Sequence, residues 1–248
     1  MIKIKSKDEI KTMRESNRIV AELIGYLSGF VKPGISTLEL DKIAREFILK
    51  KKAKPAFLGY KGYPAAICAS VNEEVVHGIP SERRLNEGDI VSIDVGVLYR
   101  DFYGDTAWTF PVGRISPLAK KLLKVTEESL YLGIGRALVG GRLSDISNAI
   151  QAQAEDNGFS VVRDFVGHGI GREMHEDPQI PNFGPPLRGV ELTEGMALAI
   201  EPMVNIGGYE TELKDDCWTA VTKDGSLSAH FEHTIAVTPE GPVILSKI

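Results

Sequence analysis

Cysteine is scarce in this sequence. Its 248 residues include only Cys68 and Cys217, too few for the disulfide framework of a small secreted protein. The same shortage argues against a zinc site built from several thiolates. Neither cysteine has a histidine at a spacing that indicates a nucleophilic pair. We therefore expect both residues to be free thiols in a reducing compartment.

Long apolar runs and an excess of basic residues are also missing. No run of about 20 apolar residues could span a bilayer, and the lysines of residues 1–7 lead into no apolar signal core. The formal net charge is -5, whereas nucleic-acid-binding proteins usually carry a clustered basic surface. The lysine-rich run at 50–54 is too short to change this. These features predict a cytoplasmic protein that binds neither membranes nor nucleic acids.

Capping patterns predict where the helices begin. Ser6 with Glu9 and Ser36 with Glu39 form two capping boxes, each ahead of apolar residues at helical spacing. A third helix is expected to begin at Ser116-Pro117 and a fourth at Ser144. The expected ends are before Pro33-Gly34 for the first helix, at Gly140-Gly141 for the third and at Asn157-Gly158 for the fourth.

The helix–glycine–helix pattern occurs twice and indicates an internal duplication. Gly34 and Gly141 lie 107 positions apart (141 − 34), and the same offset relates Leu85–Gly88 to Leu192–Gly195. We expect one catalytic domain, residues 1–248, made of two pseudo-symmetric α+β halves at roughly 1–113 and 114–248. No Pro/Ser-rich linker separates the halves, which disfavours two independent domains.

Four carboxylates lie in apolar, strand-like surroundings: Asp94, Asp105, Glu201 and Glu232. The offset of 107 relates Asp94 to Glu201, in the apolar runs 90–97 and 197–204. A charged carboxylate is costly there unless it is paired or binds a metal. A hairpin turn at 99–101 would place Asp94 and Asp105 on the same side of paired strands. These acids can bridge two ions roughly 3.5–4 Å apart, as in two-metal hydrolases.

Three histidines accompany these acids. His168 would complete a shell of oxygen and imidazole ligands that suits Mn(II), Fe(II), Co(II) or Zn(II). His175 follows it across a glycine-rich loop, and an offset of 91 (168 − 77) relates His77 to His168. These positions make His77 and His175 candidates for a role in the same site.

Two other enzyme classes lack their motifs here. Gly167, Gly169 and Gly171 do not have the Gly-x-Gly-x-x-Gly spacing of a dinucleotide loop, and Pro178 and Pro181 would interrupt a following helix. No Gly-x-Ser-x-Gly elbow of a Ser-His-Asp hydrolase is present. We interpret the three glycines as positions where the backbone passes close to metal ligands.

A set of short motifs runs from the first third of the sequence almost to its end. They are Gly59–Pro64, Asn72-Glu73, His77–Pro80, Ile93–Gly96, Gly104–Thr106, Gly167–Gly171, Ile200–Met203 and Phe231–Thr234. Together they resemble the type I methionine aminopeptidases. The resemblance implies an α+β pita-bread fold with a central antiparallel sheet covered by helices. It also implies hydrolytic removal of the N-terminal (initiator) methionine from peptides and nascent chains, with a preference for a small second residue.

The resemblance also implies roles for the site residues. Asp94, Asp105 and Glu232 would hold one ion, and Asp105, His168, Glu201 and Glu232 a second, with cobalt, manganese, iron and zinc as candidates. Glu201 would shuttle a proton while metal-activated water attacks the first peptide carbonyl. His175 would stabilise the oxyanion, and His77 would contact the scissile amide.

Residues around the expected methionine pocket also match the family. They are Tyr60, Tyr63, Cys68, Met174 and Trp218, with Phe57 added and with His77 and His175 as further substrate contacts. A soft, apolar lining suits a thioether. Met174 stands where many relatives carry an aromatic residue and Tyr103 where many carry histidine, so Met174 leaves the shape of the pocket open.

Two alternatives remain open at this stage. An Xaa-Pro peptidase of the same fold could use the same ligands, although such relatives usually carry an extra N-terminal domain. A catalytically inactive pita-bread module would bind proteins without cleaving them, but all the expected ligands are retained here. We expect a monomer. The sequence does not identify the metal or decide whether the chain associates with the ribosome.

Overall fold

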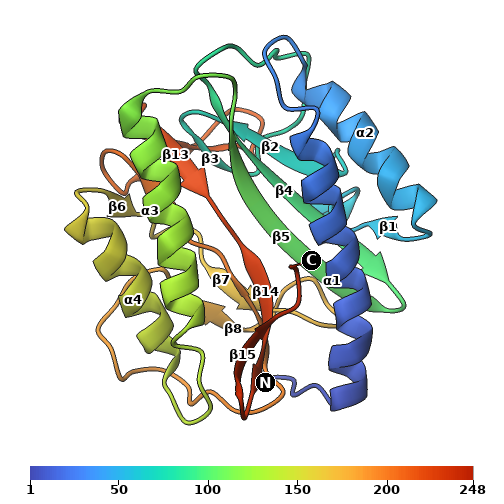
Figure 1. Ribbon diagram of the computed structural model, residues 1–248, viewed down its shortest axis with the longest axis vertical. Helices are drawn as coiled ribbons and strands as arrows, with labels where there is room; N and C mark the ends of the chain where they lie inside the picture. The colour runs from blue at the N-terminus through green and yellow to red at the C-terminus, as the bar shows by residue number, and fades with distance from the viewer. Residues whose placement is uncertain (248) are drawn as a thin grey trace.

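The computed structural model describes residues 1–247 and shows helices packed on antiparallel sheets (Figure 1). The helices are α1 (Lys7–Ser28), α2 (Thr37–Lys50), α3 (Pro117–Ile134) and α4 (Leu143–Asp156), with a 3-10 turn at Tyr60–Gly62. The strands are β1 (Lys54–Pro55), β2 (Ile67–Val71), β3 (Glu74–Val76), β4 (Ile90–Tyr99), β5 (Phe102–Pro111), β6 (Ser160–Val161), β7 (Gly167–Gly169), β8 (Glu176–Ile180), β9 (Ala197–Ile200), β10 (Met203–Asn205), β11 (Thr211–Leu213), β12 (Ala220–Thr222), β13 (Ser228–His230), β14 (His233–Thr238) and β15 (Gly241–Ile244). The predicted α+β class is confirmed.

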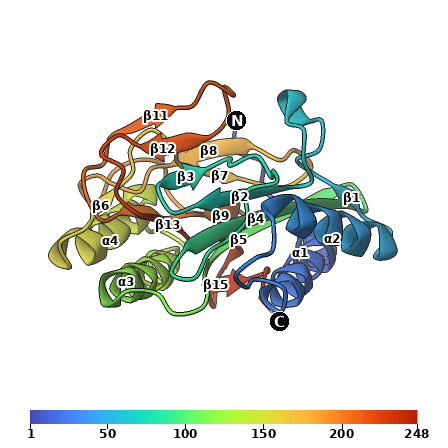
Figure 2. The same ribbon diagram turned by 90° about the horizontal axis from the view of Figure 1, so that it is seen from above.

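The antiparallel strands form four hydrogen-bonded sheets rather than one continuous sheet. In the first half, β4 pairs with β1, β2 and β5, and in the second half the order is β15-β14-β9-β7-β8. Two three-stranded sheets, β13-β10-β6 and β11-β12-β3, complete the layer. The helices lie along one side of the strands, α1 and α2 beside the first half and α3 and α4 beside the second (Figure 2). No helix within residues 1–247 is long and apolar enough to cross a bilayer.

The predicted helix starts are largely confirmed. Both capping boxes form: the Ser6 and Ser36 hydroxyls accept from the backbone N–H groups of Glu9 and Glu39. Each helix then buries one apolar face in a core cluster. The predicted end of the third helix is wrong, because α3 stops at Ile134 and short turns fill residues 135–141.

The fourth helix begins one residue earlier than expected. The residue before the helix is Arg142, whose backbone N–H donates to Oδ2 of Asp145 at 2.9 Å. Asp145 therefore supplies the reciprocal half of the cap, and Ser144 is already inside α4. Its hydroxyl instead accepts from the backbone N–H of Arg188 at 2.7 Å.

Backbone hydrogen bonds show which residues correspond in the two halves. Gly34 N–H donates to Leu85 O at 2.7 Å, and Gly140 N–H donates to Leu192 O at 2.9 Å. The counterpart of Gly34 is therefore Gly140, not Gly141. The offset between the two halves is 106 (140 − 34) in the segments that precede α2 and α4. The offset of 107 (192 − 85) holds for the strands that follow. The expectation of one constant offset is therefore wrong by one residue.

The strand register also corrects the pairing of the histidines. Ser70 of β2 lies opposite Ser92 of β4, and His168 of β7 lies opposite Ala199 of β9. Because Ser92 and Ala199 are 107 positions apart (199 − 92), the counterpart of His168 is Ser70, not His77. The resulting offset of 98 (168 − 70) instead relates His77 to position 175, which is also a histidine.

The hairpin that carries the first two acids is confirmed. Arg100 and Asp101 connect β4 to β5 with positive φ angles of 49° and 63°, as a twisted two-residue hairpin turn requires. Asp94 lies opposite Ala107 and Asp105 lies opposite Gly96. The two acids are therefore diagonal neighbours on the same face of the sheet.

Candidate metal centre and substrate pocket

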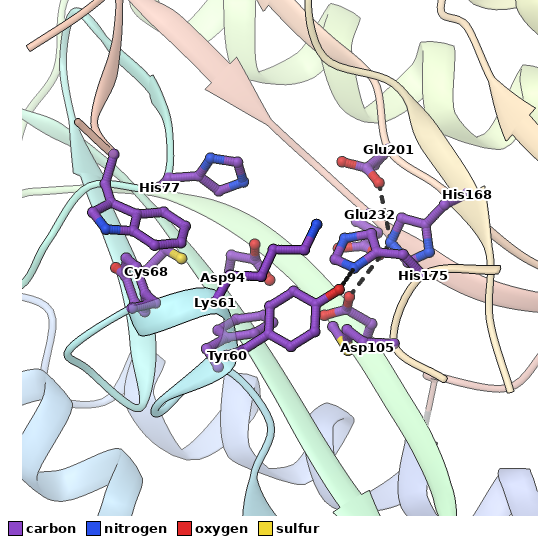
Figure 3. A pocket seen from close by; sticks show the side chains of 14 residues that line it. Tyr60, Lys61, Cys68, His77, Asp94, Asp105, His168, His175, Glu201 and Glu232 are labelled. Atoms are coloured by element: carbon purple, nitrogen blue, oxygen red, sulfur yellow. Dashed lines mark hydrogen bonds and ion pairs between the residues drawn. The ribbon is translucent and has the colours of Figure 1, made fainter. Parts of the chain in front are cut away.

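One pocket brings together residues from both halves of the chain (Figure 3). It is lined by all five predicted metal ligands: Asp94, Asp105, His168, Glu201 and Glu232. It is also lined by every predicted substrate contact: Phe57, Tyr60, Tyr63, Cys68, His77, Met174, His175 and Trp218. Thus the fold gathers side chains that are far apart in the sequence into a single site.

The first acid-bearing hairpin is bonded directly to the segment of Glu232. Glu232 N–H donates to Ala107 O at 2.9 Å, and the Thr106 hydroxyl donates to Glu232 O at 2.6 Å. The Thr234 hydroxyl donates to Asp105 O at 2.8 Å. These bonds fix the backbones of Asp105 and Glu232 side by side, across the seam between the two halves.

Glu201 is placed by a break in the second apolar run. The run expected at 197–204 divides into β9, which ends at Ile200, and β10, which begins at Met203. Pro202 has no N–H to offer a ladder, and Glu201 occupies the gap before it. One Glu201 oxygen, Oε1, lies 3.5 Å from His168 Nε2, and Oε2 lies 3.6 Å from His230 Nε2.

The ligand atoms of Asp105, His168 and Glu232 all lie within 4.8 Å of one another. Asp94 Oδ1, Asp105 Oδ1 and Glu232 Oε1 are buried and have no hydrogen-bond partner among the described residues. Among the described residues, the ion-pair contacts of the site acids are with histidines and not with lysine or arginine. Such orphaned acceptors are costly unless they coordinate a cation.

Burial and mutual repulsion both oppose ionisation of this cluster. Burial raises the pKa of Asp105, Glu201 and Glu232 well above the usual carboxyl range, and neighbouring carboxylates raise the pKa of Asp105 and Glu232 further. Burial also raises the pKa of Asp94 to about 7. Metal coordination would favour the ionised forms. The oxygen-rich set therefore fits a divalent metal ion.

His168 is oriented for coordination. Its Nδ1 lies 2.9 Å from Gly169 O, so Nδ1 carries the proton and donates to this carbonyl. The lone pair on Nε2 then faces the acids, with Asp105 Oδ2 at 3.8 Å. Burial lowers the pKa of His168 to about 3, which keeps the ring neutral. A backbone carbonyl that fixes the tautomer in this way is typical of metal-binding histidines.

Glycines allow close approaches around His168. A Cβ on Gly167 would lie 2.5 Å from Ala199 O, and one on Gly169 would lie 2.1 Å from Asp177 O. On Gly171 it would lie 2.5 Å from the Lys5 side chain. Gly167 and Gly169 thus allow the backbone on either side of His168 to pack closely, but none of these nearest atoms belongs to a predicted metal ligand, so the predicted approach of the backbone to the ligands is not what requires the glycines.

His77 and His175 extend into the pocket from different segments (Figure 3). His77 follows β3 with a positive φ of 61°, and burial lowers its pKa to about 4. Nδ1 of His175 lies 2.9 Å from the Tyr60 hydroxyl oxygen, and the two rings stack with centroids 5.4 Å apart. Burial lowers the pKa of His175, and the positive charge of Lys61 lowers it further. Both rings are thus held neutral beside the acids.

An apolar cluster adjoins the acids. Its buried members are Ala56, Phe57, Tyr63, Ala65, Cys68 and Met174, with Tyr60, Ile79, Tyr103 and Trp218 packed against them. Tyr63 and Trp218 meet edge to face with ring centroids 5.1 Å apart. The Tyr63 hydroxyl donates to Gly78 O at 2.9 Å, which satisfies its polar end. The remaining surface can receive a flexible apolar side chain.

Three residues near the pocket were not identified from the sequence. Lys61 lines the pocket itself, and Phe165 meets His77 edge to face with ring centroids 5.5 Å apart. His230 is buried, and its Nε2 has no hydrogen-bond partner among residues 1–247. Lys61 lies inside the Gly59–Pro64 motif, and His230 lies immediately before the Phe231–Thr234 motif, so these positions were the available signals.

Comparisons with known proteins agree with this arrangement. The chain matches metallopeptidase family M24 over residues 11–239. It is 56% identical to a methionine aminopeptidase of Clostridium perfringens and 56% identical to methionine aminopeptidase 1 of Bacillus subtilis, with 100% of each chain covered in both cases. A crystal structure of methionine aminopeptidase from Thermotoga maritima superposes with a TM-score of 0.98 at 49% identity, covering 100% of both chains.

A prolidase from Pyrococcus furiosus shares the fold at lower similarity. Its TM-score is 0.81 at 22% identity, and the match covers 99% of this chain but 65% of the prolidase. This likeness concerns the fold alone, whereas the full-length relatives share half or more of their residues with this chain. The chain therefore belongs to metallopeptidase family M24 and, within it, to the methionine aminopeptidases.

Proposed function

We propose that this chain hydrolyses the first peptide bond of peptides that begin with methionine, releasing the methionine and preferring a small second residue. The observation that carries the proposal is a single pocket in which an acid–histidine cluster adjoins a soft apolar lining. The full-length relatives named methionine aminopeptidases support the same activity.

We propose that Asp94, Asp105, His168, Glu201 and Glu232 would together hold two divalent ions. The three buried carboxylate oxygens without hydrogen-bond partners support this arrangement. Cobalt, manganese, iron and zinc all suit a mixed set of carboxylates and imidazole. When bound, such ions supply Lewis acidity and lower the pKa of water.

The protein side chains position the peptide and move protons. Glu201 lies at the edge of the acid cluster, where it can accept a proton from the attacking water and deliver it to the leaving amine. The Tyr60 hydroxyl lies 2.9 Å from Nδ1 of His175. If this hydroxyl donates to Nδ1, the ring keeps an N–H on Nε2 that would stabilise the developing oxyanion. His77, which lines the same pocket, would contact the scissile amide.

We further propose that the chain acts as a monomer in the cytoplasm, with nascent polypeptides among its substrates. Its bacterial relatives and its two free cysteines support this setting. Light scattering of the purified protein tests the monomer, and co-sedimentation with ribosomes tests the association that the sequence leaves open.

The expected order of substrates follows from the apolar lining. Met-Ala-Ser should be the best substrate. Norleucine-Ala-Ser, in which a methylene replaces the methionine sulfur, should be cleaved more slowly. It should still be cleaved, because a change of this size in an apolar pocket alters discrimination by only about 1–3 kcal/mol. Met-Lys-Ser should be cleaved poorly because a bulky second residue would crowd the acids. Values of kcat/KM for these peptides, for Lys-Ala-Ser and for Ala-Pro-Ser provide the measurement. Efficient release of lysine would refute the pocket, and a preference for Ala-Pro-Ser would favour the Xaa-Pro alternative.

His77→Ala should lose turnover and keep its metal. His77 lines the pocket, but in the proposed arrangement the four acids and His168 hold the ions. Loss of a contact to the scissile amide should reduce kcat by roughly 10²-fold. Isothermal titration calorimetry with Mn(II) should give the same number of bound ions as the unmodified protein. Loss of an ion from this variant would show that His77 has been assigned the wrong role.

A further inference from the structure

The turn beside the pocket holds a lysine in a fixed backbone conformation. Lys61 has a positive φ of 48° and lies between Gly59 and Gly62, whose φ angles are 83° and 90°. Backbone bonds close the turn on both sides: Gly59 N–H donates to Tyr63 O at 2.8 Å, and Tyr63 N–H donates to Tyr60 O at 2.9 Å. The position of the lysine stem is therefore set by the fold.

Lys61 is the only lysine or arginine among the described residues that line this pocket. It is exposed, and it forms no ion pair with any described residue. Its Nζ lies 5.4 Å from the centroid of the Tyr60 ring. The side chain extends from the turn towards the space between His77 and His175 (Figure 3). A positive charge with no ion-pair partner among residues 1–247 thus lies at the lining of the pocket.

We propose that Lys61 determines specificity beyond the methionine, by favouring peptides with a carboxylate side chain at the third residue. The inference rests on the proposed function, because the methionine pocket and the two histidines define where the scissile bond lies. In this proposal the peptide beyond the bond leaves the pocket past Lys61, which is exposed and lines the same pocket.

The third residue is singled out by the limits on the second. A small second residue, such as alanine or serine, offers no charge to the ammonium group. An extended chain advances about 3.3–3.6 Å per residue, so the third side chain is the first that can present a carboxylate near the flexible lysine. The surroundings are open to water. We therefore expect a modest effect, roughly tenfold between glutamate and lysine at low ionic strength.

The test compares three peptides that differ only at the third residue: Met-Ala-Glu-Ser, Met-Ala-Gln-Ser and Met-Ala-Lys-Ser, all with amidated C-termini. The amide removes the terminal carboxylate as a competing partner. The measurement is the ratio of kcat/KM for the glutamate and lysine peptides, at low ionic strength and in about 0.5 M KCl. The enzymes are the unmodified chain, Lys61→Gln, Lys61→Glu and the control Lys120→Gln. Lys120 is an exposed residue of α3 that does not line the pocket.

The unmodified chain and Lys120→Gln should prefer the glutamate peptide at low salt and lose most of that preference in KCl. Lys61→Gln should bring the ratio near one, and Lys61→Glu should invert it. The inference would be overturned by a ratio near one in the unmodified chain. It would also be overturned if Lys61→Gln and Lys61→Glu both kept the ratio of the unmodified chain. Failure to cleave any of the three peptides would instead count against the proposed function. If Lys61→Glu does not fold, the salt dependence and Lys61→Gln still decide.

Discussion

Replacing Glu201 with glutamine is expected to reduce kcat by roughly 10²–10⁴-fold. The glutamine side chain keeps an oxygen near His168 Nε2, which lies 3.5 Å from Glu201 Oε1. It cannot carry a proton between water and the leaving amine. Turnover of Met-Ala-Ser at saturating peptide gives kcat, and a thermal melt shows whether the variant is folded.

A matched control separates this effect from the general loss of a charge. Glu194→Gln removes a carboxylate that is exposed and does not line the pocket, so its kcat should stay close to that of the unmodified chain. A Glu201→Gln variant that is folded and retains kcat within tenfold would show that another group moves the proton.

Removal of the metal is expected to abolish activity altogether. The acid cluster contains buried carboxylate oxygens without hydrogen-bond partners, and burial raises the pKa of its members. Without a cation these groups must take up protons or repel one another. Prolonged dialysis against a strong chelator, followed by an assay in metal-free buffer, should give no measurable release of methionine. Addition of Mn(II) or Co(II) should restore it.

The same experiment should change stability. An ion that binds only the folded chain stabilises it by about 2.7 kcal/mol at about 100 times its dissociation constant, or roughly 5–10 °C in melting temperature for a chain of this size. Elemental analysis after reloading should find two ions per chain. Full activity in protein shown to be metal-free would contradict the proposed chemistry.

Local signals in the sequence predicted much of the fold. The capping boxes at Ser6 and Ser36 are short-range patterns, and the helices start where these patterns place them. The end of α3 was missed because a helix can stop before a glycine pair when short turns take over, as residues 135–141 do here. Which turns form depends on contacts with the rest of the chain, and those contacts have no local signature.

Acids in apolar surroundings predicted which side chains line the pocket, and the offset between Asp94 and Glu201 is consistent with the strand register, but the predicted pairing of the histidines is wrong. The motifs around His77 and His168 look alike, yet the strand register pairs His168 with Ser70. Similar short motifs can thus occupy different places in a duplicated fold. Lys61 was missed for another reason. A lone lysine in a glycine-rich segment looks like a solvated surface charge, and only the backbone geometry of the turn directs it over the pocket.

The seam between the halves has a consequence for native-state hydrogen exchange. Asp94 and Asp105 come from one half and His168, Glu201 and Glu232 from the other, so an ion bound by both sets would act as a cross-link. In metal-free protein, the amide of Glu232, which bonds to Ala107 O, could exchange when the halves part locally. With metal bound, that opening must also release the ion. The exchange of this amide would then approach the rate set by global unfolding, while amides at the surface ends of the helices keep their rates.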